Sequence, residues 1–191
     1  MASLYFYYSA MNAGKTTSLL QTDHNYGERG MKTVLFINAI DDRYGKGLIK
    51  SRIGLQKEAV IYDANFNFYD YVKNLEGLSC VLVDEAQFLS REQVDQLGDI
   101  VDFLDIPVLT YGLRTDFQGN CFSGSERLLA IADILAELKT VCFCGKKATM
   151  NMRIDAEGNK ITEGQQIDIG GNEKYISVCR KHFKTETKIL R

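Results

Sequence analysis

The sequence predicts an α/β fold with a mainly parallel sheet, followed by a small second domain built around a hairpin. Strand-like and helix-like segments alternate from residue 1 to about residue 139, which is the pattern of successive βαβ units. Several strand-like segments are apolar throughout, as expected for strands buried on both faces of a parallel sheet. After Lys139 no long helical segment is evident. We therefore expect one domain at 1–139 and a smaller one at 140–191.

The larger domain is predicted to begin with a strand. Residues 4–8 are a run of strand-forming side chains, and small residues follow them. Residues 15–25 have helical spacing, and 33–37 form a second apolar strand. The polar stretch 41–55 contains glycine and has no regular period, so we expect an irregular, mobile loop there, followed by a short strand at 59–61.

The second half of this domain repeats the alternation. Residues 80–83 are four apolar residues in succession, which indicates a fully buried strand. Residues 90–93 have the spacing of a capping box, so a helix is expected from there to about residue 103. After the single proline, 108–111 read as another buried strand. Finally, 125–138 carry apolar side chains at helical spacing and are predicted to form a helix.

The smaller domain is predicted to be mostly β-structure. Residues 141–144 read as a short strand or turn, and 150–161 as a hairpin with its turn at 155–159. A strand at 175–178 leads into Cys179. A segment of this size has little core of its own, so we expect a metal or another crosslink to stabilise it.

Composition narrows the class of protein. The chain has 191 residues, 45% of them hydrophobic and 25% charged, which is ordinary for a soluble globular protein. A net charge of −2 argues against a nucleic-acid binder that works through a basic surface.

No apolar run approaches the roughly 20 residues of a membrane span, and the N-terminus lacks the basic region of a signal peptide. An odd number of cysteines does not suggest a disulfide framework. We expect a cytoplasmic protein with neither a nucleic-acid nor a membrane partner.

A phosphate-binding loop is predicted between the first strand and the first helix. The P-loop pattern is matched, except for serine at its first position, by Ser9, Ala10, Met11, Asn12, Ala13, Gly14, Lys15 and Thr16. The loop amides and the helix N-terminus favour phosphate. Lys15 is expected to reach the outer phosphates of ATP, and the Thr16 hydroxyl to bind Mg²⁺. The alternative is a chance Gly-Lys-Thr at a helix start, but the strand before it and the helix after it supply the context that the motif requires.

Two carboxylates follow the buried strand at 80–83. Asp84 and Glu85 come at the end of a parallel strand, where such sheets bind ligands. Asp84 fits the carboxylate that holds Mg²⁺ in P-loop enzymes. Glu85 could polarise a water molecule in an ATPase, or accept the proton of an acceptor hydroxyl in a kinase, and the pattern alone does not separate these roles. The structural alternative is a solvated strand end.

A metal site is predicted in the smaller domain. Two pairs of potential ligands are separated along the chain, Cys142 with Cys144 and Cys179 with His182. Three thiolates and one imidazole satisfy a tetrahedral zinc ion and leave no open position, so the metal would be structural. The Cys-x-Cys spacing is tighter than usual. The alternative is a set of free thiols, and Cys80 is expected to pack in the core.

Together these segments resemble the zinc-containing, P-loop type of thymidine kinases, and the bacterial members above all. The resemblance spans nearly the whole chain. Besides the P-loop, it rests on the segments 84–88, 111–117 and 169–175. It implies a RecA-like P-loop fold, and Mg²⁺-dependent transfer of the γ-phosphate of ATP to the 5′-hydroxyl of thymidine, giving dTMP for nucleoside salvage and DNA synthesis. It also implies a homotetramer that is inhibited by dTTP.

The resemblance also implies roles for individual residues. Glu85 would be the general base, and the ATP site would include Asp84, Ala86 and Gln87. A loop at about 165–175 would cover the base of the nucleoside. The implied thymidine pocket comprises Phe88, Leu113, Phe117, Phe122, Gln166, Ile167, Asp168, Ile169, Gly170 and Tyr175. Core packing is an equal explanation for Phe122. Basic residues after the second strand, Arg43 and Arg52, match positions near the phosphates or are simply solvated.

Two rival functions remain at this stage. One is a RecA-like P-loop ATPase with a structural zinc, which would release ADP without an acceptor. The other is a zinc-bearing nucleic-acid-binding module. The tail offers only a modest basic cluster for such a module, at Arg180, Lys181, Lys184 and Lys188, and the net charge counts against it.

Overall fold

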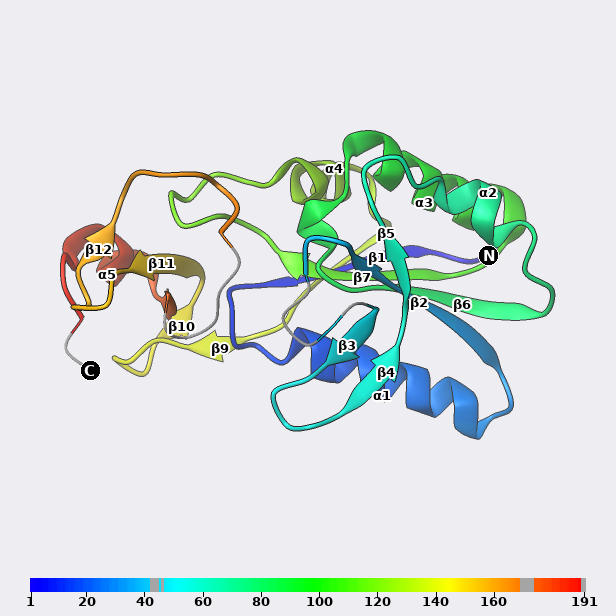
Figure 1. The fold of residues 1–191 in the computed structure, drawn as a ribbon, viewed down its shortest axis with the longest axis horizontal. Helices are drawn as coiled ribbons and strands as arrows, with labels where there is room; N and C mark the ends of the chain where they lie inside the picture. Colours follow the sequence, from blue (N-terminus) through cyan, green and yellow to red (C-terminus); the bar gives the residue numbers. More distant parts are fainter. Residues whose placement is uncertain (42–44, 46, 169–173, 190–191) are drawn as a thin grey trace.

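The protein consists of a larger α/β part and a smaller, mostly β part at one end of it (Figure 1). The computed structural model describes residues 1–41, 45, 47–168 and 174–189. None of the helices in these ranges is both long enough and apolar enough to cross a bilayer.

A six-stranded sheet forms the centre of the larger part, and every neighbouring pair in it is parallel. This confirms the predicted α/β fold class. In spatial order the strands are β5 (Val60–Tyr62), β2 (Lys32–Asn38), β6 (Leu78–Val83), β7 (Val108–Leu113), β1 (Leu4–Ser9) and β8 (Ile134–Glu137).

Helices cover both faces of this sheet (Figure 1). On one face lies α1 (Lys15–Glu28), and on the other lie α2 (Phe68–Val72), α3 (Arg91–Leu104) and α4 (Ser123–Ile131). Along β6 the side chains alternate between the two resulting cores. Cys80 and Leu82 pack in the cluster that includes Leu19 of α1, whereas Val81 and Val83 pack in the cluster that includes residues of α3. Both sets are apolar because neither face of β6 meets water.

The prediction of a single helix over 125–138 is wrong. Helix α4 ends at Ile131, and β8 begins three residues later and pairs in parallel with β1. Leu135, which fits the helical spacing, lies opposite Phe6 in the sheet. The backbone of β1 needs hydrogen-bond partners along this edge, and short apolar runs do not distinguish a strand from a helix. The carboxylate of Asp133 also accepts a hydrogen bond from the Leu4 amide at 2.7 Å.

The predicted irregular loop at 41–55 is wrong in its second half. An antiparallel hairpin is formed by β3 (Leu48–Lys50) and β4 (Gln56–Glu58). Its Lys57 makes an ion pair of 2.9 Å with Asp23 of α1. Each strand has three residues, and Ile49 is the one buried side chain among them, so the pairing leaves little periodic signal in the sequence. Residues 42–44 and 46 lie outside the described part.

The smaller part contains the predicted hairpin and strand. Strands β12 (Lys160–Ile161), β11 (Met150–Ile154) and β13 (Tyr175–Val178) form an antiparallel sheet in that order. The turn at 155–159 connects β11 to β12, as predicted. A second pair consists of β9 (Thr140–Val141) and β10 (Lys147–Ala148), and the short helix α5 (Arg180–Thr185) follows β13.

The capping box at the start of α3 is confirmed, and one of its residues makes further contacts. The Ser90 hydroxyl accepts from the Gln93 amide at 3.1 Å, and the Gln93 side chain accepts from the Ser90 amide at 3.1 Å. The buried Gln93 amide group also donates to the carbonyls of Asp63 and Phe66, at 2.7 and 3.2 Å. Gln93 therefore connects α3 to the segment that leads into α2.

Replacing Gln93 should destabilise the fold more than replacing its capping partner. Gln93→Ala should lower the free energy of unfolding by about 2–3 kcal/mol, because two carbonyls lose their donor and the cap is broken. Ser90→Ala should cost about 1 kcal/mol, the usual value of an N-cap. Urea unfolding of both variants measures the difference, and equal losses would contradict the role given to Gln93.

Candidate active site and metal cluster

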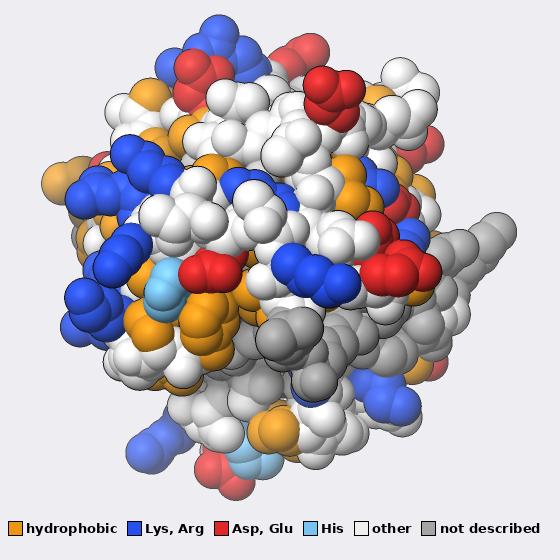
Figure 2. Space-filling view, turned by 90° about the vertical axis from the view of Figure 1, so that its left-hand side faces the viewer, with side chains coloured by type: hydrophobic (Ala, Val, Ile, Leu, Met, Phe, Trp, Pro, Cys, Tyr) orange, Lys and Arg blue, Asp and Glu red, His pale blue; other side chains and the backbone are white. Residues whose placement is uncertain are grey.

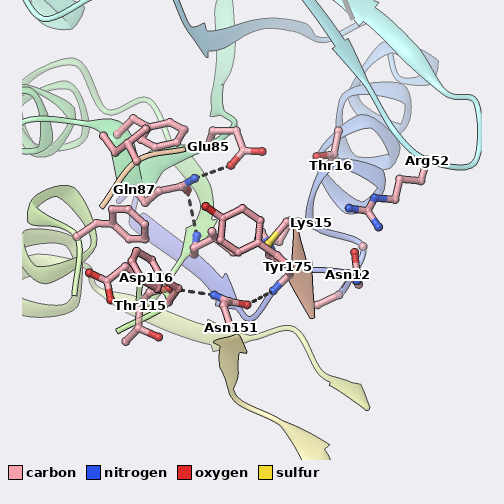
Figure 3. A pocket seen from close by; sticks show the side chains of 18 of the residues that line it. Asn12, Lys15, Thr16, Arg52, Glu85, Gln87, Thr115, Asp116, Asn151 and Tyr175 are labelled. Carbon is pink, nitrogen blue, oxygen red and sulfur yellow. Dashed lines mark hydrogen bonds between the residues drawn. The ribbon is translucent and has the colours of Figure 1, made fainter. Parts of the chain in front are cut away.

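The candidate site lies at the carboxyl ends of three adjacent strands. The phosphate loop follows β1, Asp84 and Glu85 follow β6, and the segment 113–117 leaves β7, which lies between the other two. A cavity of about 320 Å³ opens here and is also lined by residues of the smaller part (Figure 3). This is the edge at which parallel sheets bind ligands, and the volume is adequate for a small molecule.

The phosphate loop has the conformation that its small residues permit. Gly14 precedes α1 with a φ of 76°, in the left-handed region that glycine adopts readily. The buried Lys15 folds back over the loop, and its Nζ donates to the Ser9 hydroxyl at 2.9 Å and to the Ala10 carbonyl at 3.0 Å. Serine at the first position of the motif thus takes part in holding the lysine.

Thr16 and Asp84 meet across the space between α1 and β6. The Thr16 hydroxyl donates to the Asp84 carboxylate at 2.9 Å. Burial, and after it the neighbouring Glu85 carboxylate, raise the pKa of Asp84 to about 7. Oxygen ligands of this kind suit Mg²⁺, and a divalent cation would relieve the cost of burying the carboxylate charge. The two residues therefore fit the predicted cation site.

Glu85 lines the cavity with a strained backbone. Its φ of 50° and ψ of 42° lie in the left-handed region, which non-glycine residues rarely adopt and which is concentrated at functional sites. Gln87 lies in the short helix η1 (Ala86–Phe88), and its Nε2 donates to Glu85 Oε2 at 2.6 Å. Gln87 Oε1 accepts from the Leu113 amide at 3.0 Å. Gln87, which is almost fully buried, therefore ties the Glu85 carboxylate to the end of β7 (Figure 3).

An apolar wall forms another side of the cavity. It consists of Phe88, Leu113, Phe117, Phe122 and Tyr175. The rings of Phe88 and Phe122 meet edge to face, with centroids 6.1 Å apart. Phe122 is also buried, so it both packs in the interior and lines the cavity. Flat apolar side chains of this kind suit a flat ligand ring.

A polar segment of the smaller part borders the same cavity. Gln166, Ile167 and Asp168 line it. The Asp168 carboxylate pairs with Lys174 at 2.8 Å and with Arg153, and these cations hold its pKa below the usual value, with the Lys174 hydrogen bond as the largest cause. The Tyr175 hydroxyl donates to the Asp168 carbonyl at 2.8 Å. The predicted residues Ile169 and Gly170 lie outside the described residues.

The four predicted metal ligands come together in the smaller part. The ligand atoms of Cys142, Cys144, Cys179 and His182 all lie within 4.8 Å of one another. Cys144 and Cys179 Sγ are 4.0 Å apart, and His182 Nδ1 is 3.3 and 3.6 Å from Cys142 and Cys179 Sγ. Tetrahedral zinc with its usual bond lengths requires about 3.8 Å between sulfurs and about 3.6 Å between sulfur and nitrogen. The donor set and the distances therefore fit such an ion.

The local structure explains how two cysteines separated by one residue can both face the other two ligands. A turn returns the chain after Cys142, whose amide donates to the Lys146 carbonyl at 2.7 Å, and Gly145 in this turn has a φ of 79°. Cys179 is the N-cap of α5, so His182 lies in the first turn of that helix and faces back to it. The turn and the helix start therefore bring the two pairs together.

Comparison with known proteins decides the family. The sequence profile described as thymidine kinase matches residues 2–183. This chain belongs to the thymidine kinase family. It is 61% identical to a thymidine kinase of Shewanella oneidensis, over 96% of this chain and 97% of that protein. It is 56% identical to a thymidine kinase of Escherichia coli strain K12, over 99% and 94% of the two chains. The resemblance found in the sequence is thereby confirmed.

The structure brings most of the predicted site residues of this thymidine kinase family member to one cavity. Among the described residues of the predicted ATP and thymidine sites, those that do not line it directly are Ser9, Ala10, Asp84 and Ala86. Ser9 and Ala10 hold Lys15, and Asp84 holds Thr16. Arg52, in the turn between β3 and β4, lines the cavity, whereas Arg43 lies outside the described residues.

The sequence analysis assigned no role to several residues that line the cavity, although two of them lie in the segment 111–117. These include Ser51, Thr115, Asp116 and Asn151. Asp116 is buried and accepts from Gln166 Nε2 at 2.8 Å. Asn151 is polar yet almost fully buried within β11. A polar residue between two methionines in a predicted strand was the one available signal, and it did not show which residues Asn151 would contact.

Proposed function

We propose that this chain transfers the γ-phosphate of ATP to the 5′-hydroxyl of thymidine and forms dTMP. The observation that carries the proposal is one cavity lined by a phosphate loop, by a carboxylate and by an apolar wall. The printed names of its relatives agree with it. A site that only hydrolyses ATP has no need for the apolar wall.

The phosphate end of the cavity supplies positive charge. The loop amides, the N-terminus of α1 and Lys15 would hold the triphosphate and neutralise the charge that shifts during transfer. Thr16 and Asp84 would hold a Mg²⁺ ion, which supplies further neutralisation and orientation of the phosphates when bound. Because phosphoryl transfer requires mainly positioning and charge neutralisation, the rigid loop is the main contribution of this end.

Glu85 is proposed as the general base. Its carboxylate lines the cavity, and Gln87 fixes its orientation through Oε2. It would accept the proton of the 5′-hydroxyl as the hydroxyl oxygen bonds to the γ-phosphorus, the bond from that phosphorus to the β,γ-bridging oxygen breaks, and ADP leaves. Gln87 in turn accepts a hydrogen bond from the Leu113 amide. The orientation of the base is therefore coupled to the wall that would contact the nucleoside.

The nucleoside end would hold the pyrimidine by shape. The apolar wall provides contact area for the ring and its methyl group, while Gln166 and the main chain near Asp168 provide polar groups that orient its edge. The predicted covering loop at 165–175 includes the undescribed residues 169–173, and its described ends are fastened through Asp168 and Tyr175. Closing this side would exclude water from the transfer.

The metal cluster is proposed to hold structural zinc. All four positions would be occupied by protein ligands, which leaves no site for substrate or water. Three residues of the smaller core, Met152, Ile154 and Val178, are fully or almost fully buried beside the ligands Cys142 and Cys179. Such a small core is adequate only with a crosslink. We further propose that 1–139 and 140–191 are separate domains.

Other properties follow from family membership alone and are proposed with it. They are a homotetramer, inhibition by dTTP, and a role in nucleoside salvage in the cytoplasm. A nucleic-acid-binding function is not favoured. On the end of the molecule shown in Figure 2, acidic side chains lie among the basic ones, so the face is not a continuous basic surface.

Nucleoside-dependent ADP release tests the function. With ATP and Mg²⁺, the wild-type protein should release ADP only when thymidine is present. Glu85→Gln should lower kcat by roughly 10²-fold or more, because the variant cannot accept the hydroxyl proton. The matched control is Glu92→Gln, an exposed acid in the first turn of α3, which should keep full activity. ADP release that ignores thymidine would favour the ATPase alternative.

Tyr175→Phe tests the nucleoside end separately. The loss of the hydroxyl removes the 2.8 Å hydrogen bond to the Asp168 carbonyl. We expect KM for thymidine to rise about 5–10-fold, the equivalent of one hydrogen bond, with KM for ATP unchanged. Tyr71→Phe, at a more exposed tyrosine of α2, is the control. An equal rise in both KM values would argue against this assignment.

Elemental analysis tests the metal cluster. The purified protein should contain about one zinc ion per chain, and Cys144→Ser should lose most of it and unfold at a lower temperature. Cys121→Ser provides the control, because Cys121 is exposed and lies outside the cluster. Wild-type protein without zinc, or an unchanged content in Cys144→Ser, would refute the site.

A further inference from the structure

One residue of the phosphate loop is held through both of its backbone polar groups by the smaller part. The Met11 amide donates to Asn151 Oδ1 at 2.8 Å. The Met11 carbonyl accepts from the Ser177 hydroxyl at 2.6 Å. Asn151 and Ser177 lie directly opposite each other in the pairing of β11 with β13. The two side chains therefore act as one clamp, which we call the Met11 clamp.

The same asparagine also contacts the third side of the cavity. Asn151 Nδ2 donates to the Thr115 carbonyl at 3.0 Å, just beyond the end of β7. Figure 3 shows Asn151 between Thr115 and the phosphate loop. One side chain thus connects the loop after β1, the segment after β7 and the small sheet.

Burial makes these contacts costly to lose. Asn151 is 2% exposed and Ser177 is 7% exposed. Removal of either side chain therefore leaves a backbone group of Met11 without its protein partner. The clamp therefore restricts the loop more strongly than the same contacts at the surface would.

The phosphate loop needs such a restraint. Asn12, the next residue, has a φ of 64°, in the left-handed region that is unfavourable for a residue with a side chain. Strained conformations of this kind persist only where the surroundings enforce them. The clamp fixes the peptide groups on both sides of Met11, and the second of these leads directly into Asn12.

We propose that Asn151 and Ser177 are positioning residues that hold the phosphate loop in its nucleotide-binding shape. Nucleotide affinity then depends in part on a sheet that supplies no residue of the phosphate loop. Ser177 lies two residues before Cys179, so a metal ion bound by the cluster would help to secure the strand that carries half of the clamp. The inference rests on the proposed ATP site and deepens it.

Binding of Mg·ADP, measured by calorimetry without thymidine, tests the clamp. Asn151→Ala and Ser177→Ala should each raise Kd for ADP about tenfold, because the loop must be ordered on binding. The double variant should raise Kd by clearly less than a hundredfold, since both side chains restrain one residue and their effects are coupled. Ser177→Thr, which keeps the hydroxyl, should bind as the wild type does.

Met152→Ala separates positioning from general destabilisation. Met152 is fully buried in the core of the same small sheet, next to Asn151 and outside the clamp. Met152→Ala should lower the unfolding temperature at least as much as Ser177→Ala does. At temperatures where the variant is still folded, its Kd for ADP should stay within about twofold of the wild-type value.

The outcomes distinguish the two proposals. A wild-type protein that does not bind Mg·ADP would overturn the proposed ATP site itself. Wild-type binding with unchanged Kd values in Asn151→Ala and Ser177→Ala would overturn the clamp alone. So would an equal loss of affinity in Met152→Ala, because the effect would then follow from stability and not from the contacts with Met11.

Discussion

The parallel pairing of β6, β7 and β1 is the constraint on which the rest of the site depends. It places three strand ends side by side, although the segments that follow them are far apart in the sequence. The phosphate loop, the paired carboxylates and the 113–117 segment are adjacent for this reason alone. Helices on both faces bury the sheet and make it rigid, so the side chains at its edge have a fixed frame.

The sheet edge by itself leaves the cavity incomplete. The smaller part supplies Asn151, residues 166–168 and Tyr175, and it does so from strands with a small core of their own. Its geometry therefore depends on contacts with the larger part. The hydrogen bonds to Met11 and Thr115 are such contacts, and they join the stability of one part to the shape of the site in the other.

The sequence-based predictions succeeded where a residue pattern had one physical explanation. A strand, a loop of small residues and a Gly-Lys-Thr at a helix start have few alternatives, and the Ser90 capping box was equally specific. They were wrong where two structures shared one pattern. Leu135 fits a helical stripe and also an edge strand. The strand forms because the backbone of β1 needs hydrogen-bond partners along that edge of the sheet. The β3–β4 hairpin has three residues in each strand and one buried side chain, Ile49, so it had no apolar period to detect.

The sequence by itself determined the α/β class, the phosphate loop, the acidic pair after β6 and the four cluster residues, because each depends on local spacing and side-chain chemistry. Only the tertiary structure decided that Gln87 orients Glu85, that Asp84 meets Thr16, and that Asn151 and Ser177 hold Met11. These contacts join residues from different strands and loops. Buried polar groups must find partners, but which partners they find depends on the packing of elements that are distant in the chain.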